Sequence, residues 1–231
     1  MPNYDPMYFL LLLPAMILAT IAQSRVKSKF NEGKEVQSIN GVTGADAARQ
    51  ILDSQGLNNV QIEEIKTYLG DHYDPSKKVL RLSPDVYSSS SLASLGVAAH
   101  EAGHAIQDAK KYPLLVIRNA VVPIASFGSN IAMTLIVAGF AMGVFGLIKL
   151  GIIAYSTIVF FQLVNLPVEF DASKRAKEIL VQKGIIYQDE QKTVSGVLSA
   201  AAMTYVAATI SAISTLVYYI VKLGMLDKNK K

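Results

Sequence analysis

Uncharged, mostly apolar stretches alternate with polar sequence along this chain. Four such stretches stand out, at residues 7–22, 119–148, 150–168 and 193–221. A helix needs about 20 mostly apolar residues to span a bilayer, with about 17 as the lower limit. The three later stretches meet this length, and the first is close to the limit. A chain of 231 residues cannot enclose so many all-apolar helices in a soluble core, so we predict membrane helices.

The first apolar stretch is predicted to be an uncleaved membrane anchor. The residues before it carry no positive charge, unlike the start of a signal peptide, whereas Arg25, Lys27, Lys29 and Lys34 follow it. Because positive charge collects on the cytoplasmic side of a membrane, we expect the N-terminus outside and residue 25 onward in the cytoplasm.

The polar region between the first two apolar stretches is expected to fold into a small α+β unit. Thr43 resembles the start of a capping box, and the helix that follows it is predicted to end near Gly56. Alternating apolar and polar residues at 60–63 and 79–82 predict two short strands. The second strand comes before the next helix, so we expect it to offer a free edge where an extended peptide substrate binds as an added strand.

A second helix is predicted to carry the sequence His-Glu-Ala-Gly-His at 100–104. Its apolar flanks contain no proline, and the serines at 88–91 offer an N-cap. Residues four apart share a helix face, so His100 and His104 can bind one metal ion. Glu101 is then placed to take a proton from a water molecule that the metal activates. The alternative is a helix with two incidental histidines.

Composition restricts the kind of metal site and the partners. Hydrophobic residues make up 51% of the chain, which is typical of a membrane protein. Cysteine is absent, so disulfides and thiolate zinc sites are excluded and a zinc ion must be held by histidine and carboxylate. The net charge of +4 comes with lysines scattered at membrane-flanking positions. We interpret them as orientation signals and expect no nucleic-acid partner.

The third metal ligand must come from elsewhere in the chain, because catalytic zinc usually has three protein ligands and a water molecule. Glu169 follows the third apolar stretch and is expected to begin a helix that runs to Gly184. This carboxylate is a candidate ligand on the same side of the membrane as the motif. Alternatively, Glu169 and Asp171 are acids of a first helical turn, favoured there by the helix dipole. Spacing alone does not decide between the two.

Three further residues are candidates for other roles at this site. For His72 three roles are open: a structural residue beside a strand, a donor to the substrate or its oxyanion, or a metal ligand in place of Glu169. Tyr73 and Arg175 are oxyanion candidates by their chemistry.

The motif at 100–104, a membrane hairpin and then Glu169-Phe-Asp-Ala-Ser resemble the HtpX and CAAX-prenyl-protease kind of membrane zinc metallopeptidase. In those proteins the third ligand is the glutamate that opens an E-x-x-A-D motif. The resemblance therefore implies that Glu169 is the third ligand. Ser173 stands where the aspartate is expected, so Asp171 or Asp108 is a candidate for the supporting role of that aspartate.

The segments 70–75, 80–84 and 97–107 are more similar still to the YugP-type family of neutral zinc metallopeptidases of bacterial membranes. This resemblance covers nearly the whole chain. It implies a zincin-like catalytic core, one zinc ion per chain and a polypeptide substrate.

The motif helix and Glu169 must meet on one side of the membrane, which requires an even number of crossings between them. The stretches 119–148 and 150–168 supply two, as a tight hairpin around Lys149. The last apolar stretch is ambiguous. If it spans the membrane, the basic tail from Lys222 lies outside, against the charge rule; if it does not, it must be buried or lie in the interface. Its many small residues favour a span.

We therefore expect an α+β, predominantly helical integral membrane protein, with a zincin-like core and three to four transmembrane helices. Its expected parts are an anchor (1–24), a cytoplasmic catalytic region (25–113), a transmembrane hairpin (114–168), a third-ligand helix (169–192) and a C-terminal membrane helix with a basic tail (193–231).

The function expected is that of a zinc endopeptidase, a multi-pass protein of the cell membrane with its active site in the cytoplasm. The alternative is a non-hydrolytic scaffold or chaperone that keeps a zincin-like fold. Glu101 favours the enzyme, since a scaffold has no need of a general base. A metal-binding transport protein is a weaker alternative, suggested by the charges of Arg118 and Lys149 at the borders of apolar stretches. The apolar stretches contain no acidic residues, which transport pathways usually need.

Overall fold

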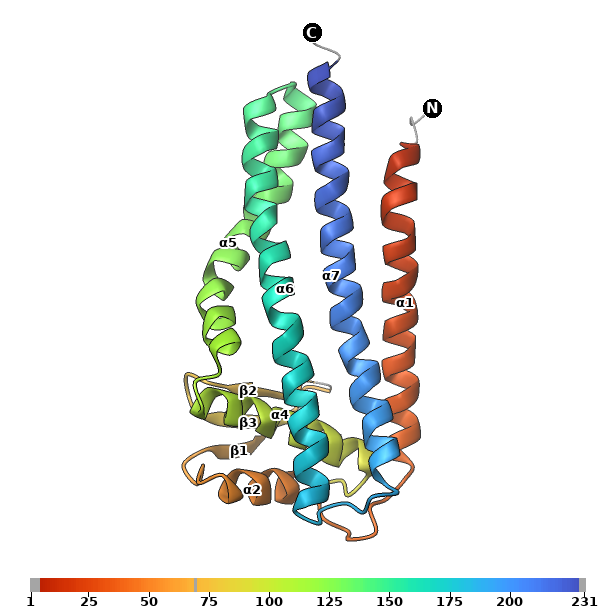
Figure 1. The fold of residues 1–231 in the computed structure, drawn as a ribbon, viewed down its shortest axis with the longest axis vertical. Helices are drawn as coiled ribbons and strands as arrows, with labels where there is room; N and C mark the ends of the chain where they lie inside the picture. The colour runs from red at the N-terminus through yellow and green to blue at the C-terminus, as the bar shows by residue number, and fades with distance from the viewer. Residues whose placement is uncertain (1–4, 69, 229–231) are drawn as a thin grey trace. The chain divides into compact units, whose positions relative to one another are not determined.

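The computed structural model describes residues 5–68 and 70–228. The leader at 1–4 and the end of the basic tail at 229–231, both used in the sequence predictions, lie outside this part. The elements, shown in Figure 1, are α1 (Pro6–Lys34), α2 (Gly44–Ser54), β1 (Gln61–Glu64), β2 (His72–Asp74), β3 (Val79–Leu82), α3 (Pro84–Tyr87), α4 (Leu92–Ala109), α5 (Pro113–Met142), α6 (Phe145–Gln182) and α7 (Gln191–Lys228). The predominantly helical α+β fold predicted from the sequence is confirmed.

The chain forms two compact units. Within the described residues, the helical unit contains 5–22, 116–166 and 204–228, and the polar unit contains 23–115 and 167–203. Helices α1, α5, α6 and α7 are long and apolar enough to cross a membrane. The stretches 7–22, 150–168 and 193–221 each lie within one of these helices, whereas 119–148 is divided between α5 and the start of α6.

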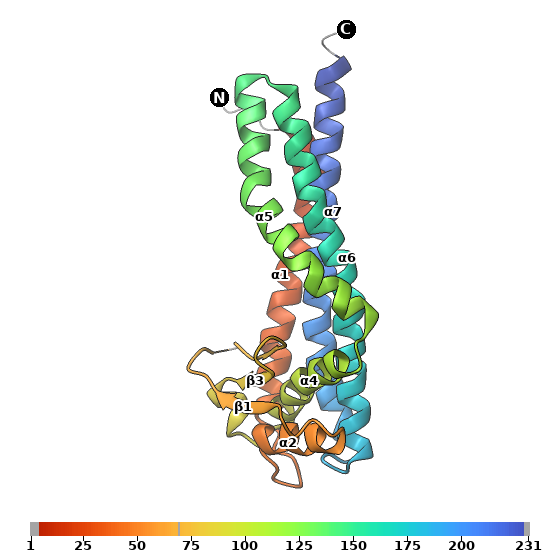
Figure 2. The same cartoon turned by 90° about the vertical axis from the view of Figure 1, so that its left-hand side faces the viewer.

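Helices α5 and α6 form a hairpin in the helical unit, as Figure 2 shows. The turn lies at Gly143 and Val144, and Gly143 has a φ of 67°, which suits glycine. The prediction of a turn around Lys149 is therefore wrong, because Lys149 lies inside α6. The charge of this lysine suggested a break, but a single lysine near a helix end does not interrupt helical hydrogen bonding.

The sheet of the polar unit has the order β1–β3–β2. Strand β3 pairs in parallel with β1 and antiparallel with β2. The expectation of a free edge at residues 79–82 is wrong, because β3 is the central strand. Residue alternation identifies a strand but does not show which neighbours pair with it. The short strand β2 was missed because its three residues, His72 to Asp74, are all polar or aromatic.

The core of the polar unit lies between the sheet, α2 and α4. Fully buried side chains from all three elements include Leu80, Ile51 and Leu95. Helix α2 begins as predicted, with the Thr43 hydroxyl oxygen accepting the amide hydrogen of Asp46 at 3.2 Å. This core fixes α4, the helix that carries the histidine motif.

Helix α6 continues from the helical unit into the polar unit. The prediction that Glu169 begins a helix is wrong, because α6 runs without a break from Phe145 through Pro167 to Gln182. The change from apolar to charged sequence at this point marks a change of surroundings and not a helix end. Glu169 and Asp171 therefore lie within the helix, and the first-turn explanation for these acids no longer applies.

Candidate metal centre

Three side chains from two helices converge within the polar unit. His100 and His104 come from α4 and Glu169 comes from α6, and one ligand atom of each lies within 4.8 Å of the others. The Glu169 Oε2 atom lies 3.2 Å from His100 Nε2 and 3.5 Å from His104 Nε2. Glu169 is only 3% exposed, so its carboxylate is held among these groups and away from solvent.

The donor set fits a zinc ion. Two imidazole nitrogens and a carboxylate oxygen are a common catalytic set, and tetrahedral zinc with bonds of about 2.1 Å holds its ligand atoms about 3.4 Å apart. The two measured nitrogen–oxygen distances lie close to that value. Among the residues that the structure describes, His100, His104 and Glu169 form the one group of three or more histidine and acidic side chains that is close enough to hold a metal ion.

A close approach of α4 and α6 brings the three side chains together. A Cβ atom on Gly103 would lie 3.0 Å from the carbonyl oxygen of Ala172 and 3.4 Å from its Cα. Ala172 is fully buried. The small residues Gly103 and Ala172 therefore allow the backbones to lie close enough for Glu169 to reach both histidines.

His104 is oriented by a hydrogen-bonded chain. Its Nδ1 lies 2.9 Å from Gln107 Oε1, while Gln107 Nε2 donates to the Val168 carbonyl at 2.9 Å and to Asp171 at 2.8 Å. These two acceptors fix the Gln107 amide with its oxygen toward His104. His104 Nδ1 is then the donor, which leaves the lone pair of Nε2 facing Glu169, as a metal ligand requires.

His100 is oriented by Ser173, whose hydroxyl oxygen lies 3.1 Å from His100 Nδ1. Ser173 occupies the position where related metallopeptidases were expected to have an aspartate. The serine itself contacts the histidine. Of the two substitutes proposed from the sequence, Asp171 reaches His104 through Gln107, whereas Asp108 binds Tyr73 and Lys78 instead.

Glu101 lies beside the metal centre and is held by the edge of the sheet. It is 8% exposed, and its Oε2 accepts the backbone amide hydrogen of Tyr73 at 3.0 Å. Strand β2 thus contacts the carboxylate next to the histidine pair. The signal that could have identified this contact is absent from the sequence, since the donor is a main-chain group.

The charges around His104 and Tyr73 shift their proton affinities. Burial disfavours a charged His104, but the hydrogen bond with Glu169 and the negative charge of Glu101 outweigh it and raise its pKa. The negative charge of the two carboxylates at the metal centre thus favours a bound cation. Burial and the Asp108 carboxylate raise the pKa of Tyr73, so its hydroxyl stays protonated and donates to Asp108 at 2.7 Å.

The remaining candidates do not join the metal-binding group. His72 is exposed on β2, with Nδ1 2.7 Å from the Gly70 carbonyl oxygen and Nε2 3.4 Å from Arg81 Nη1. Arg175 donates to Asp171 at 2.6 Å. The Tyr73 side chain faces Asp108, so its contact with the site is through its amide.

The roles of Gln107 and Gly103 were missed by sequence reasoning. Gln107 lies three positions after His104 on the same helix, and this spacing places the two side chains on one face. That spacing was available in the sequence. The close approach at Gly103 was not, because it depends on Ala172, which is far away in the chain.

A family model and a curated relative are both similar to this chain. The family model described as "putative neutral zinc metallopeptidase" matches residues 8–224. A relative from Bacillus subtilis (strain 168) named "Putative membrane protease YugP" is 44% identical over 214 residues, which cover 93% of this chain and 95% of the relative. No solved structure matches the chain with comparable significance.

Proposed function

Because this chain belongs to the neutral zinc metallopeptidase family, we propose that it is a membrane-embedded zinc endopeptidase. Its substrates are peptide bonds of membrane-associated or unfolded proteins. One observation carries the proposal: His100, His104 and Glu169 converge beside the buried carboxylate of Glu101. This convergence supports a site with three metal ligands and a general base, in a family named for zinc and peptide hydrolysis.

The first step assigns the metal. His100, His104 and Glu169 would hold one zinc ion per chain. Ser173 and Gln107 orient the two imidazoles through hydrogen bonds at Nδ1. When bound there, zinc supplies Lewis-acid chemistry, which polarises a carbonyl group and makes water a better nucleophile. Since imidazole and carboxylate ligands bind metal only when deprotonated, acid or a chelator should release the zinc.

The second step assigns proton transfer to Glu101. Its carboxylate would accept a proton from the attacking water and return it to the amine nitrogen as the peptide C–N bond breaks. The Tyr73 amide holds one carboxylate oxygen, Oε2, which leaves the other oxygen to carry the proton. The products are a carboxylic acid and an amine, so no further reactant is needed.

The alternative of a non-hydrolytic scaffold is not favoured by these contacts. A scaffold would need the three metal ligands for stability but not a buried carboxylate beside them. Burial of a charged group costs free energy unless hydrogen bonds or ions compensate it. Glu101 therefore supports a catalytic role.

The membrane arrangement is proposed with four spans and a cytoplasmic active site. In the helical unit, Tyr218 of α7 donates to Asp5 at 2.9 Å, and Lys222 forms an ion pair with the same carboxylate. The start of α1 and the end of α7 are thus on one side, which agrees with an even number of spans. Asp5 also compensates the charge of Lys222, so a basic residue is tolerated outside. The proposal keeps the five parts expected from the sequence, at residues 1–24, 25–113, 114–168, 169–192 and 193–231.

The deciding experiment combines metal analysis with a cleavage assay. Purified protein should contain about one zinc ion per chain and cut an unfolded membrane-tethered reporter, and Glu101→Gln should keep the zinc and the melting temperature. Loss of a general base typically lowers the rate by about 10²–10⁴-fold. Full cleavage by Glu101→Gln would disprove the mechanism, and cleavage by protein stripped of zinc would disprove the metal assignment.

A further inference from the structure

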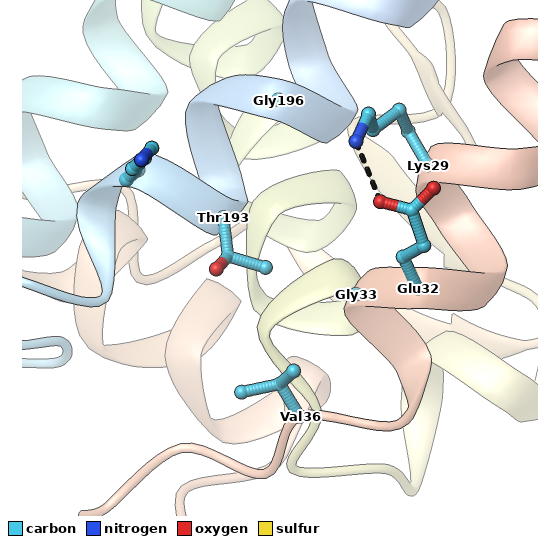
Figure 3. Close-up of a pocket in the computed structure, with 7 residues that line it drawn as sticks. Lys29, Glu32, Gly33, Val36, Thr193 and Gly196 are labelled. Carbon is cyan, nitrogen blue, oxygen red and sulfur yellow. Dashed lines mark hydrogen bonds and ion pairs between the residues drawn. The ribbon is translucent and has the colours of Figure 1, made fainter.

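Two adjoining pockets lie between α1 and α7 in the polar unit, and they share no residue with the metal centre. Figure 3 shows the larger of the two. They measure about 380 and 340 Å³ and have Lys29 and Gly196 in common. We treat them as one site, the α1–α7 pocket. The residues that matter to its chemistry are Arg25, Lys29, Glu32, Lys192, Thr193 and Gly196.

The α1–α7 pocket is lined by three cationic side chains and one carboxylate. The Lys29 ammonium contacts Glu32 at 2.5 Å, and Ser28 also donates to this carboxylate at 2.9 Å. Glu32 is therefore already satisfied. Arg25 and Lys192 are exposed and form no ion pair with any residue that the structure describes. Two positive charges thus line the pocket without a protein partner, which favours an anion.

Gly196 keeps the pocket open. A Cβ atom at this position would meet only Lys29 Cδ, at an ordinary contact distance of 3.8 Å. At Gly33, on the other helix, the same atom would lie 3.0 Å from Val197 and 3.1 Å from Ala93. The helices therefore pack closely at Gly33 and leave space at Gly196, where Figure 3 shows the side chains of Lys29 and Thr193 on either side.

The position of these residues along α1 identifies the occupant. The apolar stretch of this helix ends at Ala22, and Arg25 and Lys29 follow within about 10 Å of helix rise. The headgroup layer of a bilayer extends about 5–8 Å beyond the hydrocarbon on each side. Arg25, about 4.5 Å past Ala22, is therefore at the depth of the lipid phosphates, and Lys29 lies just beyond that layer on its aqueous side.

We propose that the α1–α7 pocket binds the phosphate headgroup of an anionic phospholipid in the adjacent leaflet. Basic pockets beside membrane helices attract such headgroups, and each nearby lysine or arginine adds about 1 kcal/mol. The Thr193 hydroxyl offers a hydrogen bond to a phosphate oxygen. This site rests on membrane insertion and not on the proposed peptidase activity, so either can fail without the other.

The test measures lipid binding by the full-length protein in a zwitterionic detergent. Short-chain phosphatidylglycerol, phosphatidylcholine with the same chains, and inorganic phosphate are titrated separately and followed by calorimetry. We expect phosphatidylglycerol to bind with a stoichiometry of one and clearly more tightly than the other two. Equal binding of phosphatidylcholine, or of inorganic phosphate, would overturn the assignment to an anionic lipid.

Two pairs of variants locate the binding. Arg25→Gln with Lys192→Gln should weaken phosphatidylglycerol binding by about 30-fold, since each cation contributes about fivefold. Lys66→Gln with Lys77→Gln makes the same change of charge on exposed side chains elsewhere in the polar unit and should have no effect. An equal loss in both double variants would show a general charge effect and overturn the site.

Gly196→Leu tests the pocket without a change of charge. The leucine side chain fills the space beside Lys29, so binding should fall although all cations are present. Gly224→Leu is the matched control on α7, because a Cβ atom there meets nothing within 4 Å. Unchanged binding by Gly196→Leu, with zinc content and melting temperature preserved in all variants, would contradict the proposal.

Discussion

At the residue scale, the candidate metal centre depends on a few atoms with defined partners. Each histidine presents Nε2 to Glu169 and has its other nitrogen engaged, by Ser173 for His100 and by Gln107 for His104. The contact made by Ser173 shows how the chain departs from the expected aspartate without leaving His100 unsupported. A hydroxyl oxygen accepts one hydrogen bond as a carboxylate would, but adds no negative charge.

Replacement of Glu169 tests the third ligand. Glu169→Gln should lower the zinc content from about one ion per chain to near zero, because two histidines alone seldom hold catalytic zinc. Zinc is measured by mass spectrometry after dialysis. Glu178→Gln is the control, since this exposed glutamate of the same helix forms an ion pair with Lys174, at 3.9 Å, and is not in the metal-binding group. If Glu169→Gln kept its zinc while His72→Ala lost it, His72 would be the third ligand.

Replacement of Ser173 tests the orientation of His100. Ser173→Ala removes the acceptor for His100 Nδ1 and should weaken zinc affinity by about 10–100-fold, as losses of such supporting groups do. Ser173→Asp restores an acceptor and should recover most of the affinity in a competition titration with a zinc chelator. Equal affinity of the serine and alanine proteins would show that this hydrogen bond does not support the metal.

At the element scale, the site depends on where α4 and α6 cross. The tight contact between Gly103 and the Ala172 backbone sets their separation. Strand β2 contributes a second constraint, because its Tyr73 amide holds Glu101 and its Tyr73 hydroxyl binds Asp108 of α4. The approach of Gly103 to the Ala172 backbone and the amide of Tyr73 are main-chain contacts. They position the side chains of Glu169 and Glu101, whose partners are not evident from the sequence.

Replacement of Gly103 tests the close approach. Gly103→Ala places a methyl group 3.0 Å from a backbone oxygen, so α6 must move by a few tenths of an ångström. Metal bonds tolerate only about 0.2 Å, and we expect zinc affinity to fall by about tenfold or more. Gly146→Ala on α6, where a Cβ atom meets nothing within 4 Å, should bind zinc normally. Parental affinity of Gly103→Ala would mean that the crossing is not limiting.

At the scale of the whole molecule, the proposed topology places the polar unit in the cytoplasm. The basic residues Arg25 to Lys34 after the first apolar stretch favour this orientation. The shared contact of Tyr218 and Lys222 with Asp5 brings the start of α1 and the end of α7 together, as the proposed even number of spans requires.

Cysteine labelling tests the orientation, since the natural chain has no cysteine. Ser54→Cys, exposed at the end of α2, should stay unlabelled by a membrane-impermeant maleimide in intact cells and react after lysis. Val144→Cys, 40% exposed in the turn between α5 and α6, should be labelled in intact cells. The reverse pattern would place the metal centre outside the cytoplasm.

Local sequence alone determined much of this protein. The four helix-forming apolar stretches, the capped helix at Thr43, the strand at 79–82 and the histidine pair at one helical turn all depend on neighbouring residues. Such features follow from side-chain periodicity and backbone preferences, which a sequence displays directly.

Tertiary structure decided what depends on residues far apart in the chain. The pairing of β3 on both sides, the unbroken path of α6 through Pro167, and the amide of Tyr73 at Glu101 are not encoded by any local pattern. The same holds for the meeting of Glu169 with His100 and His104, which requires two backbones to approach at Gly103. The physical reason is that packing selects among register, helix length and contact partners through long-range burial, whereas local propensities leave these alternatives nearly equal in free energy.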